Sequence, residues 1–98
     1  MPEDDQGVFA ISIAAEMSAL PIQNLRVYER RGLLEPDRTA GGTRLYSPDD
    51  IARLRHIAEL LAAGLNIAGI AMVLRLEDEN HRLKRANASL RRRTSPPR

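Results

Sequence analysis

The short segment of residues 41–46, Gly-Gly-Thr-Arg-Leu-Tyr, constrains the fold more than any other part of the chain. Its two adjacent glycines permit the positive φ that a tight hairpin tip requires. Residues 47–50, Ser-Pro-Asp-Asp, then begin a helix, with Ser as N-cap, Pro in the first turn and two acids at the positive end of the helix dipole. This order predicts a two-stranded wing over about residues 34–46 that leads directly into a helix.

Two short helices are predicted upstream of the wing. A brief apolar strand over residues 8–11 precedes Ser12, which is an N-cap candidate for a helix from Ile13 to about Ser18. Pro21 suits the first turn of a second helix, and Gly32 ends it. Two helices joined by a tight turn are what a helix-turn-helix requires.

The second of these helices carries side chains suited to the major groove of DNA. We expect Ile22 and Leu25 to be buried, which leaves polar side chains outside. Arginine can address a phosphate or the guanine O6/N7 edge, glutamine and asparagine can address adenine, and a tyrosine hydroxyl can donate to a phosphate. The predicted DNA-contacting residues of this helix are Gln23, Asn24, Arg26, Tyr28, Arg30 and Arg31.

The wing supplies a second set of candidates. Side chains alternate along a strand, so we expect Arg44 and Tyr46 to point outward together and Leu45 to point into the domain. The competing interpretation is that Tyr28 and Tyr46 are core aromatics whose hydroxyls find local partners. The predicted DNA-contacting residues of the wing are Arg38, Thr39, Gly42, Thr43, Arg44 and Tyr46.

A heptad pattern dominates the last third of the chain. Apolar residues recur at helical spacing from Ile51 until Gly64, and Asn66 then caps a final helix over residues 66–93. The alternating 3–4 spacing along that helix is typical of a coiled-coil seam, in which Asn at an a position selects register and strand number. This predicts a homodimer, unless the helix only packs on its own domain and its end frays. The seam residues are Val73, Leu76, Asn80, Leu83, Asn87 and Leu90.

Length and composition fit one small helical domain with a partner. The 98 residues are 43% hydrophobic and 29% charged, which gives a thin aliphatic core that a second chain would help to stabilise. We expect residues 1–7 to be a disordered acidic N-terminus, residues 8–64 a winged helix-turn-helix domain, and residues 94–98 a disordered tail. The fold class is therefore mainly α, with a C-terminal coiled-coil dimerisation helix after residue 65.

Several function classes are excluded by what the sequence lacks. Without cysteine there is no disulfide or thiolate metal site, and His56 and His81 stand in no catalytic or metal-ligand spacing, so we expect no enzyme, no metal and no cofactor. No signal peptide and no membrane-length apolar run are found, which predicts a cytoplasmic, nucleoid-associated protein. Seven Lys or Arg and no acid occupy residues 82–98, either as a solvated face or as a phosphate contact.

Residues 11–16, 25–36 and 44–47 together resemble the MerR family of transcriptional regulators. Residues 12–16, 37–42 and 65–70 resemble, more narrowly, the HspR-type heat-shock repressors of that family. The resemblance implies a winged-helix DNA reader that dimerises through an antiparallel coiled coil. It also implies repression of chaperone operons, with the Hsp70 chaperone DnaK as co-repressor. The family's DNA-contacting positions are occupied here by Arg26, Tyr28, Arg44 and Tyr46.

Three residues depart from the family pattern. Ala19 and Pro21 stand where glycine and a capping Ser or His are usual, and Val27 stands where many members have an aromatic or polar side chain. The second helix is therefore expected to start differently, with altered sequence specificity.

The predicted function is that of a sequence-specific regulator of double-stranded DNA, a repressor acting as a homodimer on an inverted repeat. One alternative is an architectural, excisionase-like DNA binder, which the dimer seam disfavours. A second is an interaction adaptor that has lost DNA binding. A steep dependence of affinity on salt distinguishes the DNA binders from the adaptor.

Overall fold

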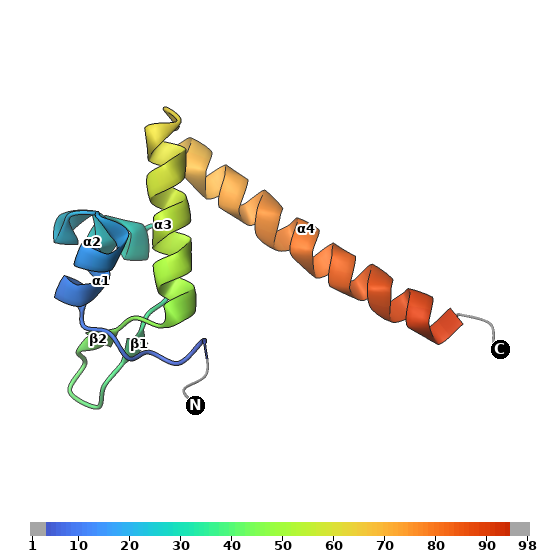
Figure 1. Ribbon diagram of the computed structural model, residues 1–98, viewed down its shortest axis with the longest axis horizontal. Helices are drawn as coiled ribbons and strands as arrows, with labels where there is room; N and C mark the ends of the chain where they lie inside the picture. Colours follow the sequence, from blue (N-terminus) through green and yellow to red (C-terminus); the bar gives the residue numbers. More distant parts are fainter. Residues whose placement is uncertain (1–3, 95–98) are drawn as a thin grey trace. The chain divides into compact units, whose positions relative to one another are not determined.

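The computed structural model describes residues 4–94, which form four helices and one two-stranded sheet (Figure 1). Two compact units are present, the first ending at Asn66 and the second beginning at Ile67. Two short helices, a hairpin and a third helix make up the first unit, and one long helix makes up the second. This is the predicted fold class, a mainly α winged helix-turn-helix followed by a long C-terminal helix. The elements are α1 (Ile11–Ser18), α2 (Ile22–Arg30), β1 (Asp37–Arg38), β2 (Arg44–Leu45), α3 (Pro48–Ala62) and α4 (Ile67–Thr94).

Helix α1 starts earlier than the sequence predicts. Its N-cap is Ala10, whose side chain makes no capping bond, and the amide of Ala14 donates to the carbonyl of Ala10 at 2.9 Å. Ser12 therefore lies within the first turn, and the predicted Ser12 cap with a start at Ile13 is wrong. The strand predicted before it is reduced to one antiparallel bridge, in which Phe9 pairs with Tyr46.

The turn between α1 and α2 contains a residue in the left-handed conformation that is not glycine. Ala19 has φ 57° and ψ 35°, and the amide of Leu20 closes the helix end by donating to the carbonyl of Ala15 at 3.1 Å. The hydroxyl of Ser18 donates to the carbonyl of Ala14 at 2.8 Å within the same turn. A Cβ in the left-handed region is strained, because it approaches the following carbonyl oxygen.

Replacing Ala19 by glycine is expected to raise the free energy of unfolding by roughly 0.5–1 kcal/mol, because the relieved strain exceeds the added entropy of the unfolded chain. Urea denaturation of the two proteins measures the change. Ala63→Gly is the matched control, since Ala63 also ends a helix but has φ −78°. That substitution relieves no strain and should lower stability; equal losses from both substitutions would contradict the strain argument.

Helix α2 ends where predicted but begins one residue later than Pro21. Pro21 is the N-cap, and Gly32, at φ 74°, ends the helix beyond the C-cap Arg31. Leu25 is fully buried as expected. Ile22 is 37% exposed, which corrects the expectation that it is buried, because the first turn of α2 projects beyond the core.

The start of α3 confirms the capping signal. The amide of Asp50 donates to the hydroxyl of Ser47 at 3.0 Å, and the amide of Ser47 donates to the Asp50 carboxylate at 2.9 Å. Pro48 occupies the first turn, where a missing N–H costs nothing. At the other end Gly64, at φ 96°, follows the C-cap Ala63 and ends the helix as predicted.

The N-terminal segment is tied to the wing and to α3 rather than free. Gly7 donates its amide to the Asp37 carboxylate at 2.8 Å, and the amide of Asp49 donates to the carbonyl of Asp4 at 3.0 Å. The disorder predicted for residues 1–7 is therefore wrong from residue 4 onward, and residues 1–3 lie outside the described part of the chain.

The core of the first unit lies where α1 packs against α2 and α3. Apolar side chains from the three helices and from the wing meet there, which fixes α2 and α3 against α1. The buried apolar residues of this unit are Ala14, Ala15, Leu20, Leu25, Tyr28, Leu33, Leu34, Tyr46, Ile51, Leu54 and Ile57.

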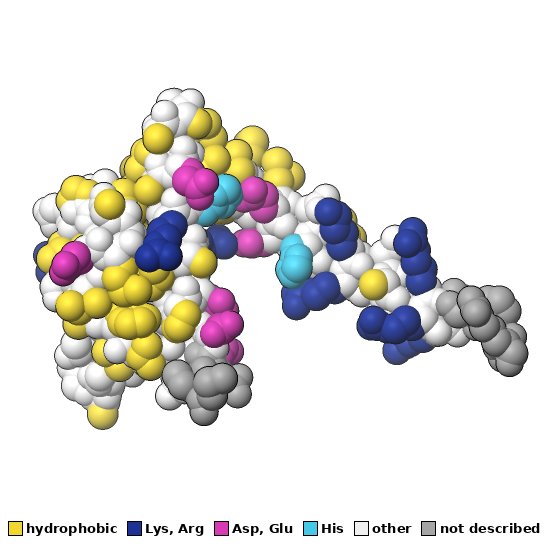
Figure 2. All heavy atoms as spheres, in the orientation of Figure 1, with side chains coloured by type: hydrophobic (Ala, Val, Ile, Leu, Met, Phe, Trp, Pro, Cys, Tyr) yellow, Lys and Arg dark blue, Asp and Glu magenta, His cyan; other side chains and the backbone are white. Residues whose placement is uncertain are grey.

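Helix α4 is continuous over 28 residues and carries segregated charge. It includes Thr94, one residue more than predicted, and the rest of the predicted tail, residues 95–98, lies outside the described part. Its acidic side chains lie near the middle of the helix, at residues 77–79, and most of its Lys and Arg side chains lie toward its C-terminal end (Figure 2). Over residues 4–94, none of the helices has the length and hydropathy needed to span a membrane.

Candidate nucleic-acid interface

The outer side of α2 carries a stripe of exposed polar side chains. Gln23, Arg26 and Arg30 follow one another at i, i+3 and i+7, which places them on one side of the helix. All three are exposed, and within residues 4–94 their side chains make no hydrogen bond or ion pair. Arg31, the C-cap, is exposed as well. These side chains are exposed, and their contacts with base edges or phosphates stay a prediction.

Asn24 and Tyr28 lie on a different side of α2. The Asn24 amide nitrogen Nδ2 donates to the Tyr28 hydroxyl at 3.2 Å, and Tyr28 is only 2% exposed. Tyr28 is thus a core aromatic with a local polar partner, as the competing interpretation holds. The expectation that its hydroxyl is presented to a phosphate is wrong for the free protein, because the ring fills the space beneath α2.

The wing is a short antiparallel hairpin in which Asp37 pairs with Leu45 and Arg38 with Arg44. The amide of Thr39 donates to the carbonyl of Thr43 at 2.8 Å, and the amide of Gly42 donates to the carbonyl of Thr39 at 2.9 Å. Gly42 has φ 86°, which confirms the glycine-dependent tip. The strands span two residues each, so the hairpin covers residues 37–45, a shorter range than the 34–46 predicted for the wing.

Glu29 joins the wing to α2 through contacts that no local sequence pattern predicts. Its carboxylate oxygen Oε2 accepts a hydrogen bond from Arg38 Nη2 at 2.8 Å, and Oε1 accepts one from Arg44 Nε. Arg38 also donates through Nη1 to the carbonyl of Gly42 at 2.9 Å. The Glu29 side chain is 19% exposed, against 47% for Arg38 and 33% for Arg44. The hydrogen bond to Glu29 raises the pKa of Arg44.

Two wing residues therefore differ from the prediction. Arg44 and Tyr46 share a face, but that face is turned toward the domain: Arg44 reaches Glu29 and Tyr46 is fully buried. The expectation that both point outward is wrong, because alternation fixes relative sides and not which side is buried. Burial raises the pKa of Tyr46, and the nearby Glu29 charge adds to the increase. Within the described residues its hydroxyl has no hydrogen-bond partner.

Tyr46→Phe is expected to leave the free energy of unfolding unchanged or to raise it by about 1 kcal/mol, since a buried hydroxyl without a partner costs desolvation. Tyr28→Phe removes a hydroxyl of similar burial that does accept a hydrogen bond, and should lower stability by roughly 0.5–1.5 kcal/mol. Thermal unfolding of both proteins tests the contrast. A loss in Tyr46→Phe as large as that in Tyr28→Phe would show that the Tyr46 hydroxyl has a stabilising partner.

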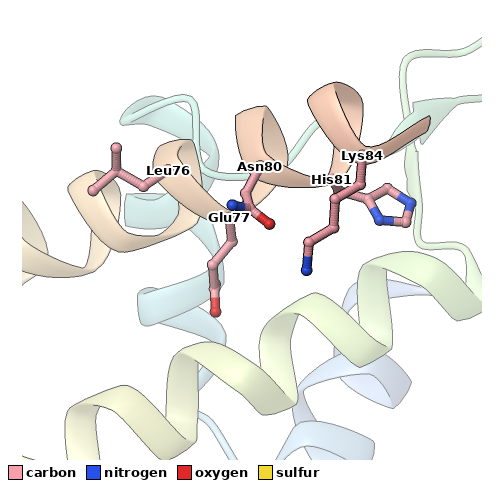
Figure 3. Close-up of a pocket in the computed structure, with 5 residues that line it drawn as sticks. All are labelled: Leu76, Glu77, Asn80, His81 and Lys84. Carbon is pink, nitrogen blue, oxygen red and sulfur yellow. The ribbon is translucent and has the colours of Figure 1, made fainter. Parts of the chain in front are cut away.

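Exposed apolar side chains line one face of α4. Leu76, Leu83 and Leu90 are 60%, 53% and 55% exposed, and Asn80 and Asn87 lie between them. An open depression of about 410 Å³ follows this face, and Glu77, Asn80 and Lys84 project there on the same side (Figure 3). A second, of about 370 Å³, continues along Leu83, Asn87 and Leu90. Val73, the first residue of the predicted seam, is half-buried.

The histidines lie on different helices, as predicted. His56, on α3, has Nδ1 3.8 Å from the Glu59 carboxylate, and His81, on α4, is exposed. Over the described part of the chain, no cluster of three or more His, Asp or Glu side chains has a metal-binding arrangement.

Known proteins share the sequence pattern and the fold of this chain. Residues 9–77 match the MerR HTH family of regulatory proteins. The chain belongs to the MerR family. A MerR-family member is a DNA-binding transcriptional regulator of a non-enzymatic family, in agreement with the stripe on α2 and the wing beside it.

Individual relatives agree with this assignment. A Streptomyces coelicolor protein with the heat-shock name HspR is 44% identical over 88 residues, which cover 89% of this chain and 58% of that protein. The present chain thus spans less than two thirds of that relative. PbrR691 from Ralstonia metallidurans CH34, solved in complex with lead(II), has a TM-score of 0.68 and 27% identity over 88% of this chain and 74% of its own. HiNmlR, a MerR-family regulator lacking the sensor domain and solved on promoter DNA, has the same fold, with a TM-score of 0.63 and 22% identity over 86% of this chain and 76% of its own.

Proposed function

We propose that this MerR-family protein represses chaperone and other heat-shock genes as a homodimer bound to an inverted repeat. The observation that carries the DNA-binding part is the exposed polar stripe of Gln23, Arg26 and Arg30 on α2, with the wing held beside the same helix through Glu29. The heat-shock part is supported by the identity with the HspR relative. Because the ligand is chromosomal DNA, the proposal places the protein on the nucleoid in the cytoplasm.

The α4 face is proposed as the dimer seam. Three leucines that are more than half exposed in the single chain repeat every seven residues, and a partner helix would cover them. Charge favours antiparallel helices, because parallel pairing would bring the two basic runs at residues 91–93 side by side. Antiparallel pairing centred near Leu83 separates those runs. It also brings the acidic residues 77–79 of one subunit level with residues 87–89 of the partner subunit, just before the partner's basic run. Two reading helices related by this two-fold axis would address two half-sites.

The proposal includes a co-repressor. HspR-type resemblance supports the Hsp70 chaperone DnaK in that role, so that free chaperone would strengthen repression. The two alternatives differ in measurable ways. An architectural binder would bind DNA without requiring an inverted repeat, and an adaptor without DNA affinity would show no salt-dependent binding.

The deciding experiment measures binding of the purified protein to two duplexes, one from upstream of its own gene and one from upstream of the host's chaperone operon. Each titration is made at two salt concentrations, with and without the Hsp70 chaperone. The proposal expects a protected inverted repeat, a loss of affinity on the order of 10³-fold between low and moderate salt for about six phosphate contacts, and tighter binding with chaperone. Specific binding elsewhere would remove the heat-shock role, and no DNA binding would favour the adaptor.

A further inference from the structure

We propose that Glu29 is a positioning residue that determines how well the protein distinguishes its operator from other DNA. It holds the two wing arginines against α2 and so keeps part of their charge from binding the phosphates of non-cognate DNA. This inference rests on the proposed DNA-binding function. It is carried by one observation: an acid in the middle of a basic surface, with both of its oxygens engaged by arginines.

The geometry makes one carboxylate serve both strands of the wing. Arg38, on β1, and Arg44, on β2, are direct cross-strand partners, and each bonds a different oxygen of Glu29. Like charges placed directly opposite each other destabilise a strand pair. A single negative charge between them offsets that repulsion and at the same time joins the hairpin to α2.

The position of Glu29 on α2 gives this contact a consequence for DNA recognition. Glu29 lies on the helical turn that also carries Arg26 and Arg30, the free cations of the reading stripe. Strands of two residues form a hairpin that is marginal by itself, so its orientation depends on what it is attached to. Glu29 therefore couples the orientation of the wing to the side of α2 that reads the bases.

The free cations and the held cations are expected to bind DNA differently. Arg26 and Arg30 can adapt to base edges or phosphates of any duplex. Arg38 and Arg44 are compensated by Glu29, so non-cognate phosphates must compete with a carboxylate that is already in hydrogen-bond contact. Only a duplex docked in the register set by α2 would gain the wing contacts without breaking the link to Glu29. Removing the carboxylate should therefore help non-cognate binding more than operator binding.

Glu29→Gln tests this with little change in shape. Glutamine keeps the side-chain length but has no charge, and its amide N–H₂ would face a guanidinium. We expect affinity for a scrambled duplex to rise about three- to tenfold at low salt, with the slope of log K against log salt steeper by roughly 1–2. Operator affinity should change less, so the ratio of operator to scrambled-duplex affinity should fall.

Two further proteins control the measurement. Glu35→Gln removes the same charge from an exposed side chain between α2 and β1 that makes no ion pair within the described residues, and should leave the salt slope unchanged. In an Arg38→Gln, Arg44→Gln background, Glu29→Gln should lose its effect on the slope, because the arginines through which it acts are absent.

The outcomes separate this inference from the proposed function. If the wild-type protein binds its operator but Glu29→Gln leaves the affinity ratio and the slope unchanged, the role of Glu29 is overturned alone. The same holds if Glu29→Gln lowers thermal stability without changing the slope, since that effect is merely structural. If the wild-type protein shows no salt-dependent DNA binding, the proposed function fails and this inference fails with it.

Discussion

Leu83→Lys is expected to convert the protein to monomers and to lower operator affinity by about 10²–10⁴-fold, because a monomer loses the advantage of engaging two half-sites at once. Leu83 is central to the predicted seam and is 53% exposed in the single chain, so the substitution should not disturb the core. A lysine at that position would place two charges in an apolar seam. Sedimentation equilibrium gives the oligomeric state, and fluorescence anisotropy with an operator duplex gives the affinity.

Ala88→Lys is the matched control for this change. Ala88 is exposed on α4 but lies outside the heptad seam. A lysine there adds the same charge to the same helix without entering the interface. It should remain dimeric and bind the operator as the wild-type protein does. A Leu83→Lys protein that stays dimeric would show that the seam lies elsewhere.

Arg26→Ala is expected to weaken operator binding by about 1–3 kcal/mol and to relax specificity at one base pair, if its guanidinium makes a bidentate guanine contact. Arg26 is exposed and has no partner within residues 4–94, so its loss should leave folding stability unchanged. Affinities for a set of operators that differ at single positions reveal the effect. A loss that is uniform across sequences, with a salt slope shallower by about 1, would instead make Arg26 a phosphate contact.

Arg75→Ala controls for the removal of one positive charge. Arg75 is exposed on α4 and is absent from both the α2 stripe and the wing. Its substitution should leave base preference unchanged at every operator position. A similar relaxation of specificity in both proteins would contradict a base-reading role for Arg26.

Local signals predicted much of this fold. The Ser47 N-cap, the ends of α2 and α3 at Gly32 and Gly64, and the glycine-dependent wing tip all depend on residues close in sequence. Each requires a hydrogen bond or a backbone conformation that few residue types supply. The start of α1 was predicted wrongly, because Ser12 is a residue type that often caps a helix. The backbone hydrogen bond from the Ala14 amide to the Ala10 carbonyl instead places Ser12 inside the first turn.

The candidate site divides in the same way. The sequence by itself determined the polar stripe on α2, because the spacing of Gln23, Arg26 and Arg30 follows from helical geometry alone. Only the tertiary structure decided that Arg38 and Arg44 are held by Glu29 and that Tyr46 is buried. The physical reason is that a strand's alternation leaves its buried side undefined, and an ion pair between a helix and a hairpin depends on how the two elements pack.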